Sequence, residues 1–391
     1  MYASKPLNKR PSPKPGFNQK LRQKKLSKTT YSFFDLVRQE KHFIALVIAL
    51  LALGAWVAPH PQIAMWFGFA LASYSAIAND SIQTLGTFIA ANTRRPWWQL
   101  WLFIGVVFVL TIVYSWWMYE GDVSYKRLSA KGLSQAPTQF SFWQLCTPII
   151  LLILTRMRIP ISTTFLLLNV FATETGAIVG MLQKSLYGYT VAFVVAAIVW
   201  WSLSIVGRRI WQDSGKTSAV WVALQWITSS MLWSIWVMQD AANIAVFLPR
   251  KLSVAALLGF VGSIFTGLGV LFYLRGDRMQ HMVSEKADLT NTRAATAVNL
   301  VYMAVLFYFK NQSTLPMSTT WVFIGLLGGR ELSISLSKRK ATKRHKALKK
   351  CVKCIRKDLK HALIGLLVSI VLALLVNPTV REAFKALSQQ L

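Results

Sequence analysis

The chain is poor in acidic residues, in cysteine and in histidine. Its 391 residues include only 14 Asp and Glu, three Cys and five His. Charged residues of both signs make up 15% of the sequence, which is too little to cover the surface of a soluble protein. Three cysteines cannot supply the framework of a disulfide-rich domain. These shortages exclude a secreted disulfide scaffold and an ordinary soluble α/β enzyme.

Motifs of common enzymes are also missing. The sequence has no Walker motif, no HExxH, no GxSxG and no dinucleotide fingerprint. None of the histidines lies in the core of an apolar run. Cys351 and Cys354 form one CxxC, a weak metal signal without a second pair, and reduced thiols are the favoured interpretation. We therefore expect neither an enzyme nor a bound cofactor. The histidines are His42, His60, His281, His345 and His361.

Apolar residues dominate instead. Hydrophobic residues make up 54% of the chain. Runs of about 20 apolar residues can cross a bilayer as helices, so we predict an all-α, polytopic membrane protein. Some runs are short, and half-spans or re-entrant segments are expected among them. The candidate spans are 43–58, 62–91, 98–117, 141–155, 160–181, 188–206, 218–248, 252–274, 288–309, 316–335 and 361–376.

Positive charge is concentrated in two blocks. Residues 1–28 carry nine Lys and Arg, and residues 338–360 carry twelve with a single acid, Asp358. Both blocks adjoin apolar runs, which is typical of cytoplasmic segments and of contact with anionic lipid headgroups rather than nucleic acid. We predict a disordered cytoplasmic arm over 1–41 and a basic cytoplasmic loop over 338–360. The expected location is a bacterial inner membrane, with the N-terminus in the cytoplasm.

Two short motifs recur in the same order along the chain. The segment 160–164 (PISTT) returns as 316–320 (PMSTT). An Asp-containing segment precedes each copy at nearly equal spacing, 79–83 (NDSIQ) and 239–243 (QDAAN). One such match arises easily by chance, but an ordered pair does not. The chain therefore contains an internal repeat.

The number of spans in each half of the chain predicts how the two copies of the repeat are oriented in the membrane. Five candidate spans fall in 61–210 and five in 211–391. An odd number of spans inverts the second copy relative to the first, as in many secondary transporters. We predict two inverted-topology repeats, preceded by an extra N-terminal transmembrane helix over 42–60. Broken or re-entrant helices are expected at the site.

The two aspartates of the motifs lie inside apolar runs. A carboxylate in the membrane core costs about 3 kcal/mol on insertion scales unless it faces polar partners. Carboxylate and amide oxygens together suit Na⁺ or a proton carrier, so we predict a cation site. An interhelical hydrogen-bond clamp is the alternative. The residues are Asp80 and Asp240, flanked by the amides Asn79, Gln83, Gln239 and Asn243.

The two PxSTT copies are typical of helix starts. Pro fits the first helical turn, and Ser or Thr caps the free N–H groups there. The free N–H groups and the positive end of the helix dipole attract anions. Two such starts facing each other would form an oxyanion cradle for phosphate or sulfate, and a simple N-cap at each copy is the alternative. The cradle residues are Ser162, Thr163, Thr164, Ser318, Thr319 and Thr320.

Together the four motifs resemble the signatures of the inorganic phosphate transporter (PiT) family, which are cation-coupled phosphate symporters. Residues 79–87 (NDSIQTLGT) are similar to the family's NDxANxxGT signature, and 239–243 resemble its second Asn-Asp motif. Both PxSTT copies resemble its PxSTTH segments. The resemblance spans roughly 62–376 and implies the same fold. It implies that Asn79 and Gln239 join the cradle at phosphate, while Asp80, Asp240, Gln83 and Asn243 hold the cation.

Four positions depart from the family pattern. Gln83 and Gln239 stand where the family has Asn, and Phe165 and Trp321 stand where it has His. Without those histidines a proton relay has no titratable group, which favours Na⁺ over H⁺. We predict Na⁺-coupled symport of phosphate by alternating access. A sulfate or other oxyanion transporter and a non-transporting phosphate sensor are the alternatives, and homo-oligomerisation is left open.

Overall fold

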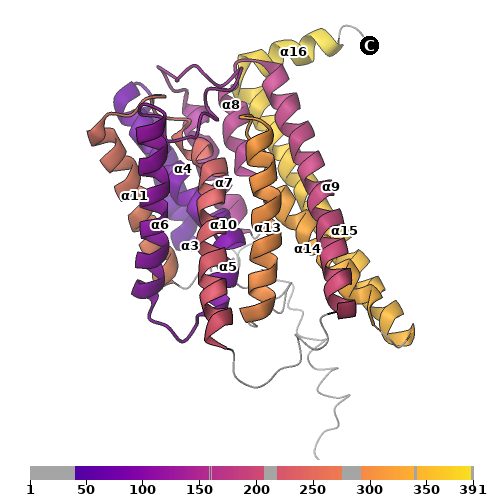
Figure 1. The fold of residues 1–391 in the computed structure, drawn as a ribbon. Helices are drawn as coiled ribbons and strands as arrows, with labels where there is room; N and C mark the ends of the chain where they lie inside the picture. Colours follow the sequence, from indigo (N-terminus) through magenta and orange to yellow (C-terminus); the bar gives the residue numbers. More distant parts are fainter. Residues whose placement is uncertain are drawn as a thin grey trace, which may run out of the picture. The chain divides into compact units, whose positions relative to one another are not determined.

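The computed structural model of the chain describes residues 40–157, 159, 161–206, 218–274, 292–338 and 341–388. Every regular element within these ranges is a helix, which confirms the predicted all-α fold (Figure 1). The chain divides into two compact units, Met1–Leu50 and Leu51–Leu391, and the second contains the whole predicted site. Residues 1–39 of the predicted basic arm lie outside the described residues.

Six of the described helices, α6, α9, α10, α11, α13 and α15, are long and apolar enough to cross a membrane. The protein is therefore a multi-pass integral membrane protein. Its orientation and the type of membrane stay predictions. In chain order the helices are α3 (Lys41–Val57), α4 (Pro61–Asn79), α5 (Ser81–Ala91), α6 (Trp97–Met118), α7 (Phe142–Arg156), the π-helical turn η1 (Thr164–Leu168), α8 (Asn169–Phe171), α9 (Thr175–Val206), α10 (Ala219–Ala245), α11 (Val254–Tyr273), α13 (Thr292–Gln312), α14 (Thr319–Leu336), α15 (Ala341–Val376) and α16 (Pro378–Ser388).

The apolar run over 62–91 is divided at Asp80. α4 ends at the residue before it and α5 begins at the residue after it. The Asp80 side chain caps neither helix, because both of its oxygens accept hydrogen bonds from other side chains. A broken helix at the site is therefore observed, as predicted.

The region after the first PxSTT copy differs from the prediction of separate spans over 160–181 and 188–206. α8 ends at Phe171, and α9 then continues without a break from Thr175 to Val206. Two polar residues inside this run, Lys184 and Ser185, donate to backbone carbonyls. Lys184 Nζ donates to the carbonyl of Leu315 at 2.7 Å, and Ser185 Oγ donates to the carbonyl of Met181 at 2.6 Å. The predicted break between the two spans is wrong.

The basic block over 338–360 is mostly helix, so the prediction of a loop there is wrong. α15 begins at Ala341 and joins this block to the last apolar run without interruption. Lys, Arg, Leu and Ala favour helix formation, and residues 341–364 of α15 contain no Gly or Pro. Its contact with anionic lipid stays a prediction.

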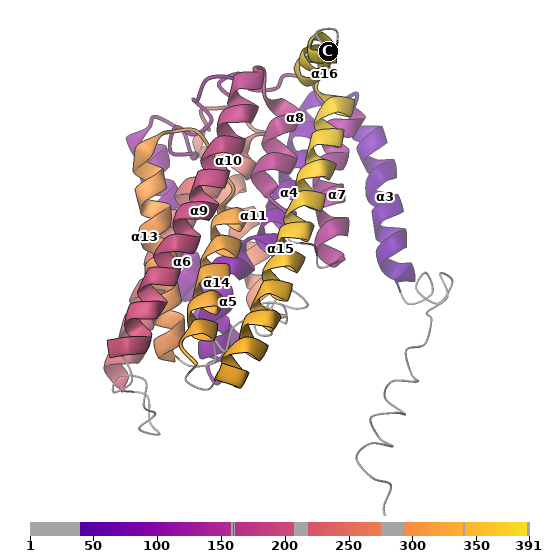
Figure 2. The ribbon, with the colours of Figure 1, turned by 90° about the vertical axis from the view of Figure 1, so that its right-hand side faces the viewer.

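Close packing places α14 between α9 and α15 (Figure 2). A Cβ atom added at Gly325 or Gly329 would overlap the backbone carbonyl of Tyr189 or Phe193 on α9. Only glycine allows the two backbones to approach so closely. Gly329 therefore serves helix packing.

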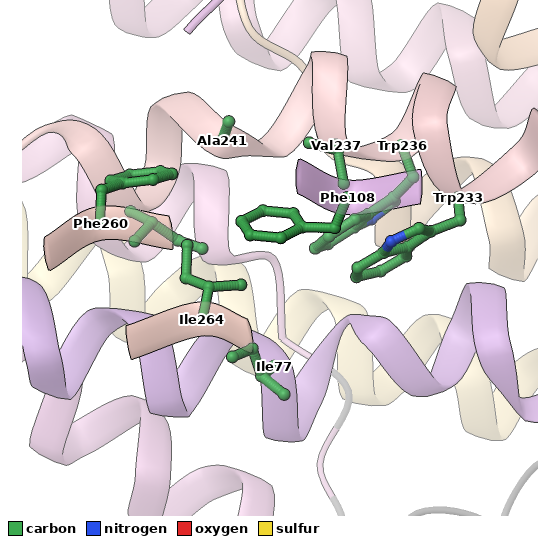
Figure 3. A pocket seen from close by; sticks show the side chains of 9 residues that line it. Ile77, Phe108, Trp233, Trp236, Val237, Ala241, Phe260 and Ile264 are labelled. Carbon is green, nitrogen blue, oxygen red and sulfur yellow. The ribbon is translucent and has the colours of Figure 1, made fainter. Parts of the chain in front are cut away.

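A small apolar pocket lies between α4, α6, α10 and α11 (Figure 3). Its lining includes Phe108, Trp233, Trp236, Phe260 and Ile264. The volume of about 10 Å³ is no larger than one water molecule requires. This face of α10 is therefore apolar core, and the polar site lies on another face.

Candidate functional site

Asp80 and Asp240 are both buried in the helix bundle. Asp80 stands in the break between α4 and α5, and Asp240 lies near the C-terminal end of α10. Their exposed fractions are 0% and 2%. A carboxyl group at this depth requires hydrogen bonds in place of water. Both groups have them.

Four side chains donate hydrogen bonds to Asp80. Asn79 Nδ2 lies 2.8 Å and Gln83 Nε2 lies 3.2 Å from Oδ1. Thr320 Oγ1 lies 3.3 Å from the same oxygen, whereas Thr163 Oγ1 donates to Oδ2 at 2.5 Å. Thr163 belongs to the first PxSTT copy and Thr320 to the second. Asp80 therefore brings the two copies together.

Asp240 has a corresponding set of donors. Thr319 Oγ1 donates to Oδ2 at 2.6 Å, and Asn243 Nδ2 donates to Oδ1 at 2.7 Å. The same Asn243 nitrogen lies 3.0 Å from Thr163 Oγ1 and 3.2 Å from Thr164 Oγ1. Since Thr163 also bonds Asp80, one asparagine and one threonine link the two carboxylates.

The hydrogen bonds follow the same rule in both halves of the chain. The first threonine of each PxSTT copy donates to the aspartate that precedes it in the sequence. The amide three residues after each aspartate donates to the second threonine of the opposite copy. The four bonds are Thr163 to Asp80, Thr319 to Asp240, Gln83 to Thr320 and Asn243 to Thr164. The inverted topology of the halves stays a prediction.

The serines of both copies act as helix caps. Ser162 Oγ accepts from the backbone N–H of Phe165, and Ser318 Oγ accepts from that of Trp321, both at 3.3 Å. These are the bonds expected from the simple N-cap interpretation. The serines thus hold the helix starts in shape, while the threonines face the carboxylates. The positive end of the α14 dipole lies at the site.

The first copy leads into a π-helical turn, η1. Such turns are rare in proteins, and many of those that occur lie at functional sites. Thr164 at its start donates to the carbonyl of Met317 at 3.1 Å, so the two copies are in direct contact. Pro160 of this copy lies outside the described residues.

The amide side chains of the site leave their oxygens without partners. All four are buried and use their nitrogens as donors. A buried acceptor without a hydrogen bond is rare and costs about 1–3 kcal/mol. With the two carboxylates, these oxygens are the hard ligands that fit a cation such as Na⁺. The unpartnered atoms are Asn79 Oδ1, Gln83 Oε1, Gln239 Oε1 and Asn243 Oδ1.

The departures from the family pattern have visible consequences. Asn79 Nδ2 donates to the carbonyl of Ile161 at 2.8 Å, whereas the longer Gln239 donates to that of Leu306 on α13 at 3.0 Å. Phe165 and Trp321 pack edge to face, with ring centroids 5.3 Å apart. Two apolar rings therefore occupy the positions at which the family has histidines.

Two further residues belong to the site and carried no signal in the sequence. Tyr302, fully buried on α13, donates its hydroxyl to the carbonyl of Thr319 at 3.0 Å. Arg127, 2% exposed in the segment between α6 and α7, donates to the carbonyl of Met238 at 2.9 Å. Its guanidinium also donates to the carbonyls of 313–315. In the sequence these residues look like ordinary span and loop residues.

Arg127 thereby joins the two segments that carry the second half of the site. Met238 comes two residues before Asp240, and residues 313–315 lead into the second PxSTT copy. Burial lowers the pKa of the Arg127 guanidinium to about 10, and the nearby Asp240 opposes this shift. The group remains cationic at neutral pH.

Two further features lie outside the site. Arg330 and Glu331 form an ion pair, with Nη1 and Oε1 2.7 Å apart. In the CxxC, Cys351 is buried, Cys354 is exposed and both are free thiols. Among the described residues, no group of three or more His, Cys, Asp or Glu is placed to hold a metal ion.

Comparisons with known proteins give one similarity in structure. No family model matches the chain, and no curated protein matches it. A solved structure named "The sodium-dependent phosphate transporter" is similar, with 15% sequence identity and a TM-score of 0.47. The similarity covers 83% of this chain and 99% of that chain.

Proposed function

We propose that the protein transports inorganic phosphate across the membrane together with a cation, and that the cation is Na⁺. The observation that carries the proposal is the set of four unpartnered amide oxygens beside two buried carboxylates. A cation in contact with these oxygens removes the cost of leaving them unbonded. It also offsets the charge that the carboxylates bring into the bilayer.

Phosphate binds, in this proposal, between the start of η1 and the start of α14. The donors are the threonine hydroxyls of the two copies and the side-chain N–H groups of Asn79 and Gln239. These donors are neutral, and the α14 dipole adds a positive potential. Such a cradle fits an oxyanion that enters with its own counter-cation.

The hydrogen bonds also suggest how the two ions depend on each other. The single hydroxyl hydrogen of Thr163 points to Asp80, and that of Thr319 points to Asp240. When a cation binds the carboxylates, these hydroxyls are released and become donors for the anion. Each ion therefore prepares the groups that the other binds, and the coupling is reciprocal. Movement of one half of the protein against the other then exposes the filled site to alternate sides.

The direct test is uptake of labelled phosphate into proteoliposomes. We expect uptake that rises with an inward Na⁺ gradient and is small with a choline gradient. Competition by arsenate and sulfate identifies the anion, and a stronger effect of sulfate would reassign the substrate to sulfate. Phosphate binding without uptake would identify a sensor. No uptake and no binding by folded protein would end the proposal.

The carboxylates are tested by Asp80→Asn and Asp240→Asn. We expect each variant to fold, because Asn has the same shape and can still accept from the threonines. Na⁺-driven uptake should fall at least about 100-fold, since the charge that holds the cation is gone. Glu174→Gln is the control, because Glu174 is partly exposed and pairs with the exposed Lys131. Wild-type uptake in both Asp variants contradicts the assigned role.

A further inference from the structure

A line of buried polar side chains leads away from the site between α5, α10 and α13. We call it the polar seam. Four of its five members lie on three helices that pack against one another, and the fifth, Asn92, directly follows α5. They are exposed by 6% or less although all of them can hydrogen-bond water. The members are Thr87, Asn92, Gln225, Ser229 and Asn299.

The polar seam is one continuous chain of hydrogen bonds. Thr87 Oγ1 donates to Asn299 Oδ1 at 2.7 Å, and Asn299 Nδ2 donates to Ser229 Oγ at 2.8 Å. Gln225 Nε2 donates to the same serine oxygen at 3.1 Å. Asn92 Nδ2 donates to Gln225 Oε1 at 3.0 Å. Each step joins two neighbouring polar side chains without an apolar residue between them.

The polar seam connects the site with one exposed end of the bundle. Thr87 lies one helical turn beyond the site residue Gln83 on α5. Asn92 directly follows the end of α5, and residues 93–96 after it are exposed. This end is cationic, since it contains Arg94 and Arg95. A positive mouth attracts a phosphate ion.

At the Arg94–Arg95 end of the bundle, the side chain of Trp226 closes the polar seam. Trp226 Nε1 donates to Asn92 Oδ1 at 3.0 Å. The guanidinium of Arg95 covers the same indole ring, with Cζ 5.0 Å from the ring centroid. The site is therefore shut off from this end by side chains that can all exchange their partners for water.

Opening costs less along the polar seam than along the apolar contacts of α10. A hydrogen bond between side chains can be replaced by bonds to water at little net cost. Exposure of apolar surface costs about 25 cal/mol per Å². Toward α6 and α11, α10 packs large rings, including Trp233, against Phe108 and Phe260 around the pocket of Figure 3. Separation of α5 from α10 and α13 exposes the polar seam to water and parts one aromatic contact, that of Phe88 with Trp226.

We propose that the polar seam is the path by which the ions pass between the site and the Arg94–Arg95 end of the bundle. It opens when α5 moves away from α10 and α13, and its amides and hydroxyls then line a hydrated passage. This inference rests on the proposed transport function. A permanent interhelical clamp is the competing explanation of the same hydrogen bonds.

Cysteine accessibility separates a path from a clamp. In the full chain with Cys146, Cys351 and Cys354 replaced by Ala, Ser229→Cys is treated with a negatively charged, membrane-impermeant methanethiosulfonate in proteoliposomes. Ser369→Cys is the matched control, because Ser369 is 1% exposed and Ser229 0%. Among the described residues, the Ser369 hydroxyl bonds only to the carbonyl of Gly365 on its own helix. We expect Ser229→Cys to react at least about 10-fold faster. Equal, slow rates in the two variants, with and without Na⁺ and phosphate, would overturn the path.

The outcome for the path is independent of the outcome for phosphate transport. Wild-type uptake decides the proposed function, whereas the reactivity of Ser229→Cys decides whether the polar seam opens. If Ser229→Cys reacts but the wild-type protein takes up no phosphate, the passage is supported and phosphate is rejected as the transported ion. An unreactive variant in a protein that transports phosphate removes the passage alone.

A second measurement is made in a protein that keeps its three native cysteines. Asn299→Leu keeps the number and branching of the side-chain heavy atoms but removes both hydrogen bonds at the middle of the polar seam. We expect the maximal uptake rate to fall at least about 10-fold while the apparent KM values for Na⁺ and phosphate change less than about threefold. Ser369→Ala should transport like the wild type. Wild-type uptake by a monodisperse Asn299→Leu protein would contradict the path.

Discussion

One hydroxyl group, that of Thr163, lies at the centre of the site. It donates to Asp80 and accepts from Asn243, which also bonds Asp240. A hydroxyl has one hydrogen to donate, so it cannot serve the carboxylate and an anion at once. At the scale of the residue, coupling between cation and anion is therefore a question of where this hydrogen points.

Thr163→Val tests this arrangement. Valine has nearly the same shape but no hydroxyl, so we expect Na⁺ binding to persist while the affinity for phosphate falls at least about 10-fold. Addition of Na⁺ should then no longer increase phosphate affinity, which isothermal titration calorimetry measures directly. Thr147→Val is the control, because Thr147 is equally buried and its hydroxyl donates to the carbonyl of Trp143 on its own helix. An unchanged Na⁺ effect in Thr163→Val contradicts the role of the hydroxyl.

At the scale of the element, the helix ends carry the site. Asp80 stands at the break between α4 and α5, where its carboxylate accepts from threonines of both PxSTT copies. The Ser318 cap fixes the start of α14, whose Thr319 donates to Asp240. Where the chain continues as helix, polar residues serve packing instead, as Ser185 does in α9 by accepting the backbone N–H of Ser318 at 2.8 Å. Helix termini thus supply the unsatisfied groups that an ion needs.

A pair of N-cap variants separates capping from anion binding. Ser318 caps α14 at the site, and Ser253 caps α11 away from it by accepting the backbone N–H of Ala256. We expect Ser318→Ala and Ser253→Ala each to lower stability by about 1 kcal/mol. Only Ser318→Ala should weaken phosphate binding, because its helix start faces the site. Thermal unfolding and phosphate titration measure the two effects, and equal phosphate affinity in both variants would restrict Ser318 to capping.

At the scale of the whole molecule, ion binding stabilises the fold through linkage. A ligand at 100 times its Kd stabilises the native state by about 2.7 kcal/mol. We expect Na⁺ in place of choline to raise the Tm, and phosphate to raise it further only when Na⁺ is present. Asp240→Asn should abolish both shifts. Equal Tm values in Na⁺ and choline would argue against a Na⁺ site.

The sequence alone determined the membrane class and the parts of the site. Apolar runs with few charges can be stable only in a bilayer or a core, so the all-α membrane fold follows from composition. The two Asp motifs and the two PxSTT copies were identifiable because they recur in order. Their side chains do meet, as the bonds from Thr163 and Thr320 to Asp80 show.

Only the tertiary structure decided which groups are partnered. Gln83 and Thr320 are 237 residues apart in the chain, so no local pattern could show that they bond at 3.2 Å. Arg127 acts through backbone carbonyls, which every residue has, and therefore left no mark in the sequence. Lys184 in α9 likewise donates to the carbonyl of Leu315, which lies 131 residues away in the chain. Local chemistry sets what a side chain can bind, and the fold sets which atoms remain free to bind it.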